Sequence, residues 1–175
     1  MKHRIFVALL FFSSVMPTWA EPAWLVQIKD SLLNEIGGQL TLMAEKMALR
    51  ESRQHINISY LDPRLNFSVC TQALSTQPPL PLKLGRSHIK VSCADKKSWA
   101  INVPVDIVLY APVVTLNQPL TRGSEIKAEH LSLTEQNLAA LRNGYFLKKE
   151  LVIGKQSKRS LAGHTVINSH LILPS

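Results

Sequence analysis

One short pattern occurs twice in the last third of this 175-residue chain and constrains its fold more than any other feature. Residues 123–131 and residues 163–171 both read G-x-x-[IV]-x-x-x-H-L, and the two copies begin 40 positions apart. A glycine turn followed by a β-branched residue and a leucine is typical of a turn that leads into a short strand. The repetition predicts a small β domain with internal pseudo-symmetry, with structural turns at Gly123, Gly154 and Gly163.

The first twenty residues predict export. Positions 2–4 are basic, residues 5–12 form an unbroken apolar run, and Thr18 and Ala20 stand at −3 and −1 of a cleavage point after Ala20. The apolar run is too short to span a bilayer, which needs about 20 residues. The residue directly after the cleavage point is Glu21 rather than a cysteine, so a lipid anchor is not expected, and no later segment is apolar enough to span. We therefore expect a soluble exported chain without a stable membrane anchor.

The charge balance of the exported chain is basic. The signal carries two of the 20 Lys and Arg residues and none of the 12 acidic ones, which leaves 18 basic against 12 acidic residues. This balance suits an acidic partner or an anionic envelope surface. Export, rather than charge, excludes nucleic acid as the partner.

Two cysteines remain after processing, Cys70 and Cys93. In an oxidising compartment they predict one disulfide, and closing its loop would stabilise the fold by roughly 3 kcal/mol. A metal or redox site is disfavoured because the chain has no C-x-x-C motif and no Cys/His cluster. Strand alternation places Cys93 on an apolar face and Cys70 on a polar one, so a bend near Cys70 is required.

The exported chain should begin with an amphipathic helix that has Pro22 in its opening turn. The pair Gly37-Gly38 would cost about 2 kcal/mol relative to alanines, which predicts a break or kink there. The polar face is not lysine-rich, so packing on the protein's own sheet is favoured over a groove-binding or membrane-surface role. The apolar stripe recurs at three- and four-residue steps and comprises Leu25, Ile28, Leu32, Ile36, Leu40, Met43 and Met47.

The next zone alternates apolar and polar residues, which predicts strands. Residues 56–60 and 65–69 alternate on either side of a turn, an exposed proline-rich loop follows at 78–81, and alternation resumes at 89–93. Residues 99–109 give the clearest strand. Pro104 lacks an N–H and therefore predicts that this strand lies at an edge or carries a bulge. An exposed edge could pair with another chain, although protected edges are the commoner case.

The third zone begins near residue 111 and contains the repeated pattern. Residues 134–142, with Gly144 beyond their end, predict a short capped helix. A strongly basic stretch follows, in which Glu150 is the one acid. This stretch is either a solvated face or a docking patch for an acidic partner, with Lys155, Lys158 and Arg159 as the candidate docking residues. Its six basic members are Arg142, Lys148, Lys149, Lys155, Lys158 and Arg159.

The sequence contains no recognisable catalytic constellation. It has no G-x-S-x-G elbow, no H-E-x-x-H helix and no glycine-rich dinucleotide loop. His130 and His170 hold matching places in the two pattern copies, and equivalent structural positions explain them better than a metal pair does. An envelope hydrolase is disfavoured because no nucleophile–base pair is evident. We expect no enzyme activity, no cofactor and no metal.

An ordered set of short segments resembles one known family. The segments include Arg122-Gly123, His130-Leu131, Ile153-Gly154-Lys155 and Lys158-Arg159, preceded by residues 61–65, Cys70, Cys93 and Trp99. Together they resemble the periplasmic chaperones for flagellar basal-body P-ring formation, which carry a SAF-type domain. The resemblance implies an α+β, mainly β fold with an N-terminal amphipathic helix, a small disulfide-linked β domain and a SAF-like (β-clip) region. It implies a signal peptide at 1–20, a helix-plus-β domain at 21–110 and a SAF-like domain at 111–175.

The resemblance also implies a function. A family member is a non-enzymatic periplasmic chaperone that binds the flagellar P-ring protein transiently, until it forms the ring around the rod. The alternative is an envelope glycan-binding SAF module without chaperone activity, in which the basic stretch contacts an anionic sugar.

The resembling chains continue into a further β-rich segment, and this sequence is expected to be a shortened member. A strand without its neighbour would leave backbone groups unpaired beside the apolar run of residues 171–173. We therefore expect partial disorder after about Leu161 and poor support of ring assembly.

Overall fold

The computed structural model describes residues 21–62 and 64–173. The expected signal peptide, with its cleavage point after Ala20, lies outside these residues. The elements are the helix α1 (Ala23–Lys46), the strands β1 (Arg53–Ile58), β2 (Ser75–Gln77), β3 (Gly85–Cys93), β4 (Trp99–Leu116) and β5 (Leu131–Asn137), and the 3-10 turns η1 (Ala128–His130), η2 (Leu138–Ala140) and η3 (Lys149–Leu151). The expected α+β, mainly β fold is confirmed.

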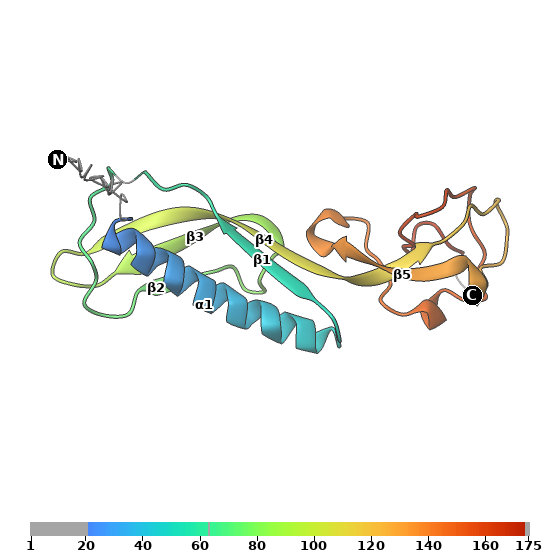
Figure 1. The fold of residues 1–175 in the computed structure, drawn as a ribbon, viewed down its shortest axis with the longest axis horizontal. Helices are drawn as coiled ribbons and strands as arrows, with labels where there is room; N and C mark the ends of the chain where they lie inside the picture. Colours follow the sequence, from blue (N-terminus) through green and yellow to red (C-terminus); the bar gives the residue numbers. More distant parts are fainter. Residues whose placement is uncertain (1–20, 63, 174–175) are drawn as a thin grey trace, which may run out of the picture.

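Helix α1 lies along the sheet and buries the predicted stripe against it (Figure 1). The expected break at Gly37-Gly38 is wrong, because the helix runs without interruption from Ala23 to Lys46. Each fully buried aliphatic side chain contributes about 1.5–3 kcal/mol, so the stripe outweighs the cost of two glycines. The buried residues of the helix are Trp24, Leu25, Ile28, Leu32, Ile36, Leu40 and Ala44.

Strand β4 is the centre of an antiparallel sheet in the order β1-β4-β3-β2, and β5 pairs with the later part of β4. The strand as a whole is therefore not an edge strand, although its first part, residues 99–104, pairs in the ladder with β3 alone. Pro104 is tolerated because it lies where β1 ends, with Ile58↔Val105 as the last pair. Ser59 N donates to Pro104 O at 3.0 Å. The return bond would need the N–H that proline lacks, so the pairing stops there.

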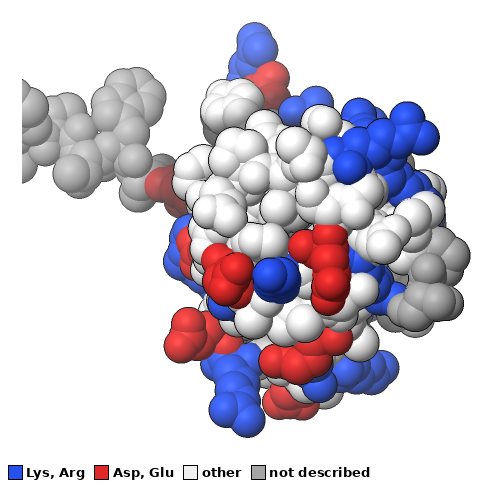
Figure 2. All heavy atoms as spheres, turned by 90° about the vertical axis from the view of Figure 1, so that its right-hand side faces the viewer, with Lys and Arg blue, Asp and Glu red and all other residues white. Residues whose placement is uncertain are grey.

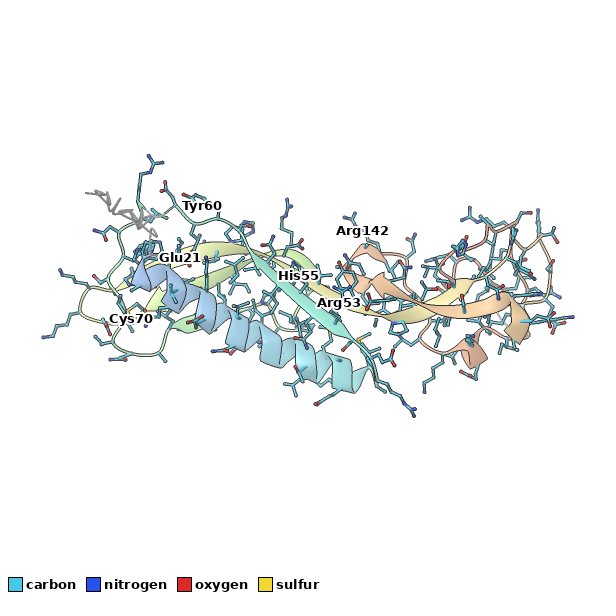
Figure 3. All side chains as sticks on the ribbon, viewed as in Figure 1. Glu21, Arg53, His55, Tyr60, Cys70 and Arg142 are labelled. Atoms are coloured by element: carbon cyan, nitrogen blue, oxygen red, sulfur yellow. A yellow bond between two sulfur atoms is a disulfide. The ribbon has the colours of Figure 1, made fainter. Side chains whose placement is uncertain are left out.

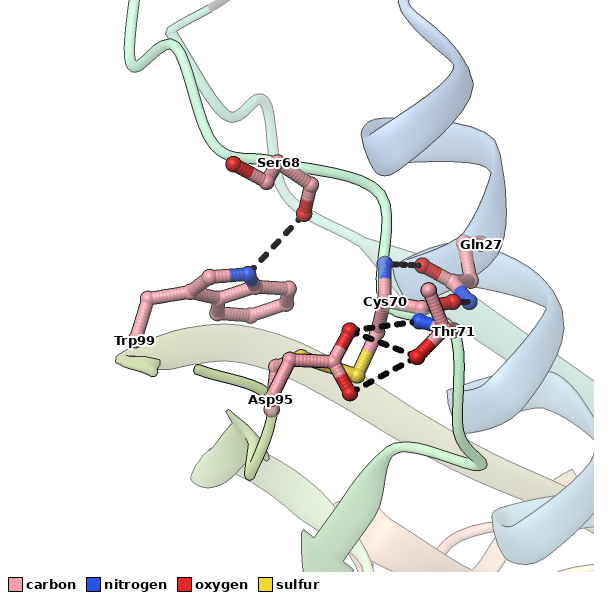
Figure 4. The surroundings of a disulfide bond; sticks show 7 residues. Gln27, Ser68, Cys70, Thr71, Asp95 and Trp99 are labelled. Carbon is pink, nitrogen blue, oxygen red and sulfur yellow. Dashed lines mark hydrogen bonds between the residues drawn. A yellow bond between two sulfur atoms is a disulfide. The ribbon is translucent and has the colours of Figure 1, made fainter. Parts of the chain in front are cut away.

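The segment between β1 and β2 is irregular, and the strand expected at 65–69 is wrong. Residues 59–62 and 64–74 contain no strand. Phe67 packs instead between Trp24 (ring centroids 5.2 Å apart) and Trp99 (4.9 Å). The Trp99 Nε1–H donates to Ser68 O at 2.9 Å (Figure 4). Because these contacts position the segment through its side chains, strand alternation does not decide where Cys70 points.

The described residues pack into two hydrophobic clusters, and β4 passes from one to the other. The first cluster lies between α1 and the sheet and extends to Val113, while the second begins at Val114. Figure 1 shows β4 as a long strand that joins the helix-covered sheet to the C-terminal region. The division of the chain into domains at residue 111 remains a prediction.

The C-terminal region has an internal twofold pseudo-symmetry, as the repeated pattern predicts. Leu120 and Leu161 stand near its axis and exchange two backbone hydrogen bonds, of 2.9 and 2.8 Å. On either side, backbone bonds recur at an offset of 41 residues. For a bond between the two copies, the donor moves forward by 41 and the acceptor moves back by 41. For a bond within one copy, both residues move forward by 41. The matched bonds are Gly123 N to Ser157 O with His164 N to Leu116 O, Ile126 N to Lys155 O with Ile167 N to Val114 O, and Asn117 N to His130 O with Lys158 N to Leu171 O.

The offset of 41 corrects the sequence alignment of the repeat by one residue. Gly123 adopts a φ of +79°, and the equivalent left-handed position in the second copy is His164 (φ +63°), one residue beyond Gly163. The structural counterpart of His130 is Leu171, so the two histidines of the pattern are not equivalent. The sequence pattern aligns Gly123 with Gly163, whereas the backbone conformation aligns Gly123 with His164.

Two further expectations for this region are wrong. Residues 134–142 are not a helix, because β5 extends to Asn137 against β4 and only η2 (Leu138–Ala140) is helical. Disorder after Leu161 is wrong as well. Ile167 is fully buried, Ile172 is 5% exposed, and Leu173 N donates to Gln156 O at 2.8 Å.

Candidate partner-docking site

The pseudo-symmetric backbone holds the predicted docking residues in place. Gly154 takes a φ of +82°, which reverses the chain just before Lys155. Ile126 brackets this turn, because its N–H donates to Lys155 O and its carbonyl accepts from Gly154 N, both at 2.8 Å. Lys158 N donates to Leu171 O at 2.9 Å. Buried Ser157 fixes the residues between them through a 2.7 Å bond from its Oγ to Thr121 O.

Lys155 and Lys158 line an open hollow of about 500 Å³ with an apolar floor. Leu151 and Leu173, which belong to that floor, are 53% and 40% exposed. The arrangement fits an apolar side chain next to an acidic one, since an apolar floor and ammonium groups lie side by side. Arg159 follows Lys158 directly and is exposed, but it does not line the hollow. The other lining residues are Phe146, Ser169 and Ile172.

The six basic residues of the stretch do not form one patch. Lys149 Nζ donates to Leu131 O at 2.8 Å and has a structural role. Lys148 lines a separate hollow of about 320 Å³ between the end of α1 and β5. Figure 3 places Arg142 in the loop after η2, above the middle of the molecule. The structure therefore brings together Lys155 and Lys158, with Arg159 beside them.

The charges at this end of the molecule are unevenly placed. In Figure 2 several Lys and Arg side chains gather at the upper right, while Asp and Glu lie mainly in the lower half among other basic side chains. Partial burial raises the pKa of Tyr145, the neighbour of Phe146 in the chain, so its phenol stays neutral at physiological pH. The hollow can attract an anion, but its described lining includes no carboxylate or imidazole that could act as a general base.

The predicted disulfide between Cys70 and Cys93 is present, with a Cα–Cα distance of 5.8 Å. Its surroundings are held by hydrogen bonds (Figure 4). The Gln27 side chain accepts from Cys70 N at 2.9 Å and donates to Cys70 O at 2.8 Å, and the Asp95 carboxylate accepts from Thr71 N at 2.7 Å. Asp95 lies close enough to the sulfurs to suggest a metal group, but both sulfurs are in the disulfide.

The pattern histidines have ordinary surroundings. His130 Nδ1 accepts from Lys127 N at 3.2 Å, which closes the turn of η1. His170 is exposed, and its backbone N–H donates to Asn168 Oδ1 at 3.0 Å. Among the described residues, neither histidine belongs to a group of three that could hold a metal ion.

Sequence reasoning did not identify the apolar part of the site. Phe146, Leu151 and Ser169 come from separate segments that only the fold brings together. The apolar run at residues 171–173 indicates an aggregation risk in the sequence alone, whereas in the structure Ile172 and Leu173 line the hollow.

Comparison with known families shows what this region is similar to. Residues 111–175 match the family model described as "Chaperone for flagella basal body P-ring formation". The resemblance to the P-ring chaperone family is confirmed. The description of that family is of a chaperone, not of an enzyme. Comparison with curated proteins found no significant match.

Two solved structures of Salmonella FlgA have a fold similar to that of this chain. Salmonella FlgA in closed form aligns with a TM-score of 0.52 and 20% sequence identity over 81% of this chain and 69% of that one. Salmonella FlgA in open form aligns with a TM-score of 0.52 and 20% identity over 80% of this chain and 64% of that one. The chain therefore has a FlgA-like fold. No helix among its described residues is both long and apolar enough to cross a bilayer.

Proposed function

We propose that this chain is a periplasmic assembly chaperone that binds the flagellar P-ring subunit and promotes P-ring formation around the rod. The match of residues 111–175 to the P-ring chaperone family carries the proposal. The predicted signal peptide at 1–20 supports delivery to the periplasm.

Lys155, Lys158 and Arg159 are the proposed docking residues for the subunit. A chaperone of this kind must cover an apolar or strand-edge surface that otherwise associates too early. The hollow beside Lys155 and Lys158 offers an apolar floor for such a surface. Neighbouring positive charges would speed the encounter and select an acidic partner.

Capture of the purified, unassembled P-ring subunit tests the proposal. Reversing Lys158 and Arg159 to glutamate, with Lys155→Glu added in a second variant, should weaken capture at least tenfold at low salt and flatten its salt dependence. The matched control for the triple variant is Lys83→Glu/Lys96→Glu/Lys97→Glu. It makes the same change in net charge at three exposed residues that flank β3, outside the C-terminal region.

The outcomes separate the candidate functions. Retention of the subunit by the wild-type chain and the control, but not by the docking variants, supports the proposal. Unchanged capture by the docking variants would assign these residues to a solvated face. Failure to retain the subunit, together with retention of an anionic envelope glycan, would favour the glycan-binding alternative.

A further inference from the structure

The sheet has one face without a covering layer among the described residues. Helix α1 packs on the face that carries Ile89, Val91 and Val103. Alternation along the strands turns the neighbouring residues to the opposite face. On β3 these are Arg86, His88 and Lys90, and all three are exposed. An antiparallel sheet can leave one face in water, so exposure alone does not indicate a site.

The charge pattern of this face is more informative. Arg86, His88 and Lys90 follow each other at every second residue, so neighbouring side chains stand about 6–7 Å apart along the strand. Asp106 on β4 lies opposite Arg86 in the register. It is the one acid on β1, β2, β3 or β4. The row of Arg86, His88 and Lys90 is called the β3 cationic row below.

Among the described residues, no member of the β3 cationic row forms an ion pair. The cations that do form ion pairs lie elsewhere, such as Arg53 with Glu135 at 2.8 Å and Arg64 with Asp62 at 3.0 Å. Apart from Asp106, the residues opposite the row on the flanking strands are uncharged. Lys90 faces Asn102 on β4 and Gln77 on β2, and His88 faces Pro104. The row therefore presents donors that the protein itself does not neutralise.

The spacing of the row specifies its ligand. Carboxylates on an extended peptide recur on one face at every second residue, with the same rise per residue as β3. A helix would place its acidic side chains three and four residues apart and would match the row poorly. Charge complementarity and matching period together favour one occupant, an extended acidic segment of a partner protein.

We propose that the uncovered face of the sheet, centred on the β3 cationic row, binds an extended acidic segment of a partner protein. The acidic side chains of that segment lie over Arg86 and Lys90, and His88 donates a hydrogen bond between them. This surface is distinct from the hollow beside Lys155 and Lys158, and it does not depend on the partner being the P-ring subunit.

A dye-labelled peptide of about ten residues in which Glu alternates with Thr is the probe, and its binding to the purified protein is followed by fluorescence anisotropy. The double variant Arg86→Glu/Lys90→Glu should bind it at least tenfold more weakly at low salt. The control Lys96→Glu/Lys97→Glu makes the same charge change at two exposed residues between β3 and β4 and should change binding by less than about twofold. Circular dichroism melting confirms that both variants fold.

Three outcomes would overturn the proposal. The control could lose as much affinity as the row variant, which would mean that only net charge matters. A peptide of equal composition with its glutamates in one block could bind as tightly, which would remove the role of spacing. Dextran sulfate could bind through Arg86 and Lys90 while the peptide does not, which would assign the face to an anionic polysaccharide.

Discussion

At the scale of single residues, the C-terminal region has two equivalent positions whose backbone is in the left-handed conformation, and the two carry different residues. Gly123 and His164 occupy equivalent places with φ of +79° and +63°. A residue with a Cβ pays roughly 1–2 kcal/mol in this conformation, and glycine does not, although glycine loses more entropy on folding. We therefore expect His164→Gly to raise the free energy of unfolding by about 0.5 kcal/mol and Gly123→Ala to lower it by about 1 kcal/mol.

Urea denaturation of both variants measures this difference. A Cβ at Gly123 would meet no heavy atom within 4 Å, so the loss there reports backbone conformation rather than a clash. Destabilisation by His164→Gly would show that the imidazole makes a contact worth more than the backbone strain.

At the scale of elements, α1 shows that the burial of an apolar stripe can outweigh the low helix propensity of two glycines. Gly37 and Gly38 stand inside a continuous helix, and a Cβ at either would meet nothing within 4 Å. Replacing each with alanine should therefore raise the free energy of unfolding by up to about 1 kcal/mol, as measured by thermal or urea denaturation. A loss of stability in either variant would mean that the glycine serves a contact or bend that the helix geometry does not reveal.

The same scale shows which elements the sequence could predict. The apolar period of α1 and the alternation through β4 were strong enough to place both elements, because each buries a long stripe. The segment from 59 to 74 alternated as well, but its Phe67 packs between two tryptophans and its Cys70 is tied to β3, so no ladder forms. Leu138 and Leu141 have a helical spacing, but the residues before them, up to Asn137, pair with β4 as strand β5, so the predicted helix does not form.

The candidate site was predictable only in its charges. Lys155, Lys158 and Arg159 lie close together in the sequence, so a basic cluster is visible without a structure. Phe146, Leu151 and Ile172 reach the same hollow through the twofold arrangement, which the repeated pattern indicated with an offset one residue too short. The β3 cationic row required the register of the sheet, which alternation alone does not give.

At the scale of the whole molecule, the two clusters should respond separately to damage. The disulfide lies in the part built by α1 and the sheet, whereas Ile126 and Ile167 lie in the second cluster. Replacing Cys70 and Cys93 with serine should cost roughly 3 kcal/mol in the first part. Amide hydrogen exchange should then rise in α1 and β3 and stay unchanged at Ile126 and Ile167. Equal loss of protection in both clusters would show that β4 couples them into one cooperative unit.

The twofold exchange of backbone bonds in the C-terminal region also sets the order in which the chain can fold. The end of β4 pairs with β5, but most other backbone bonds of residues 114–131 go to residues 152–173, so neither half can complete its backbone bonding by itself. Contacts between residues this far apart require loop closure before they contribute stability, which slows folding. The half that is synthesised first must therefore wait for the last residues of the core before its pairing is complete. During that interval it exposes apolar side chains and unpaired backbone groups to which a holding chaperone can bind.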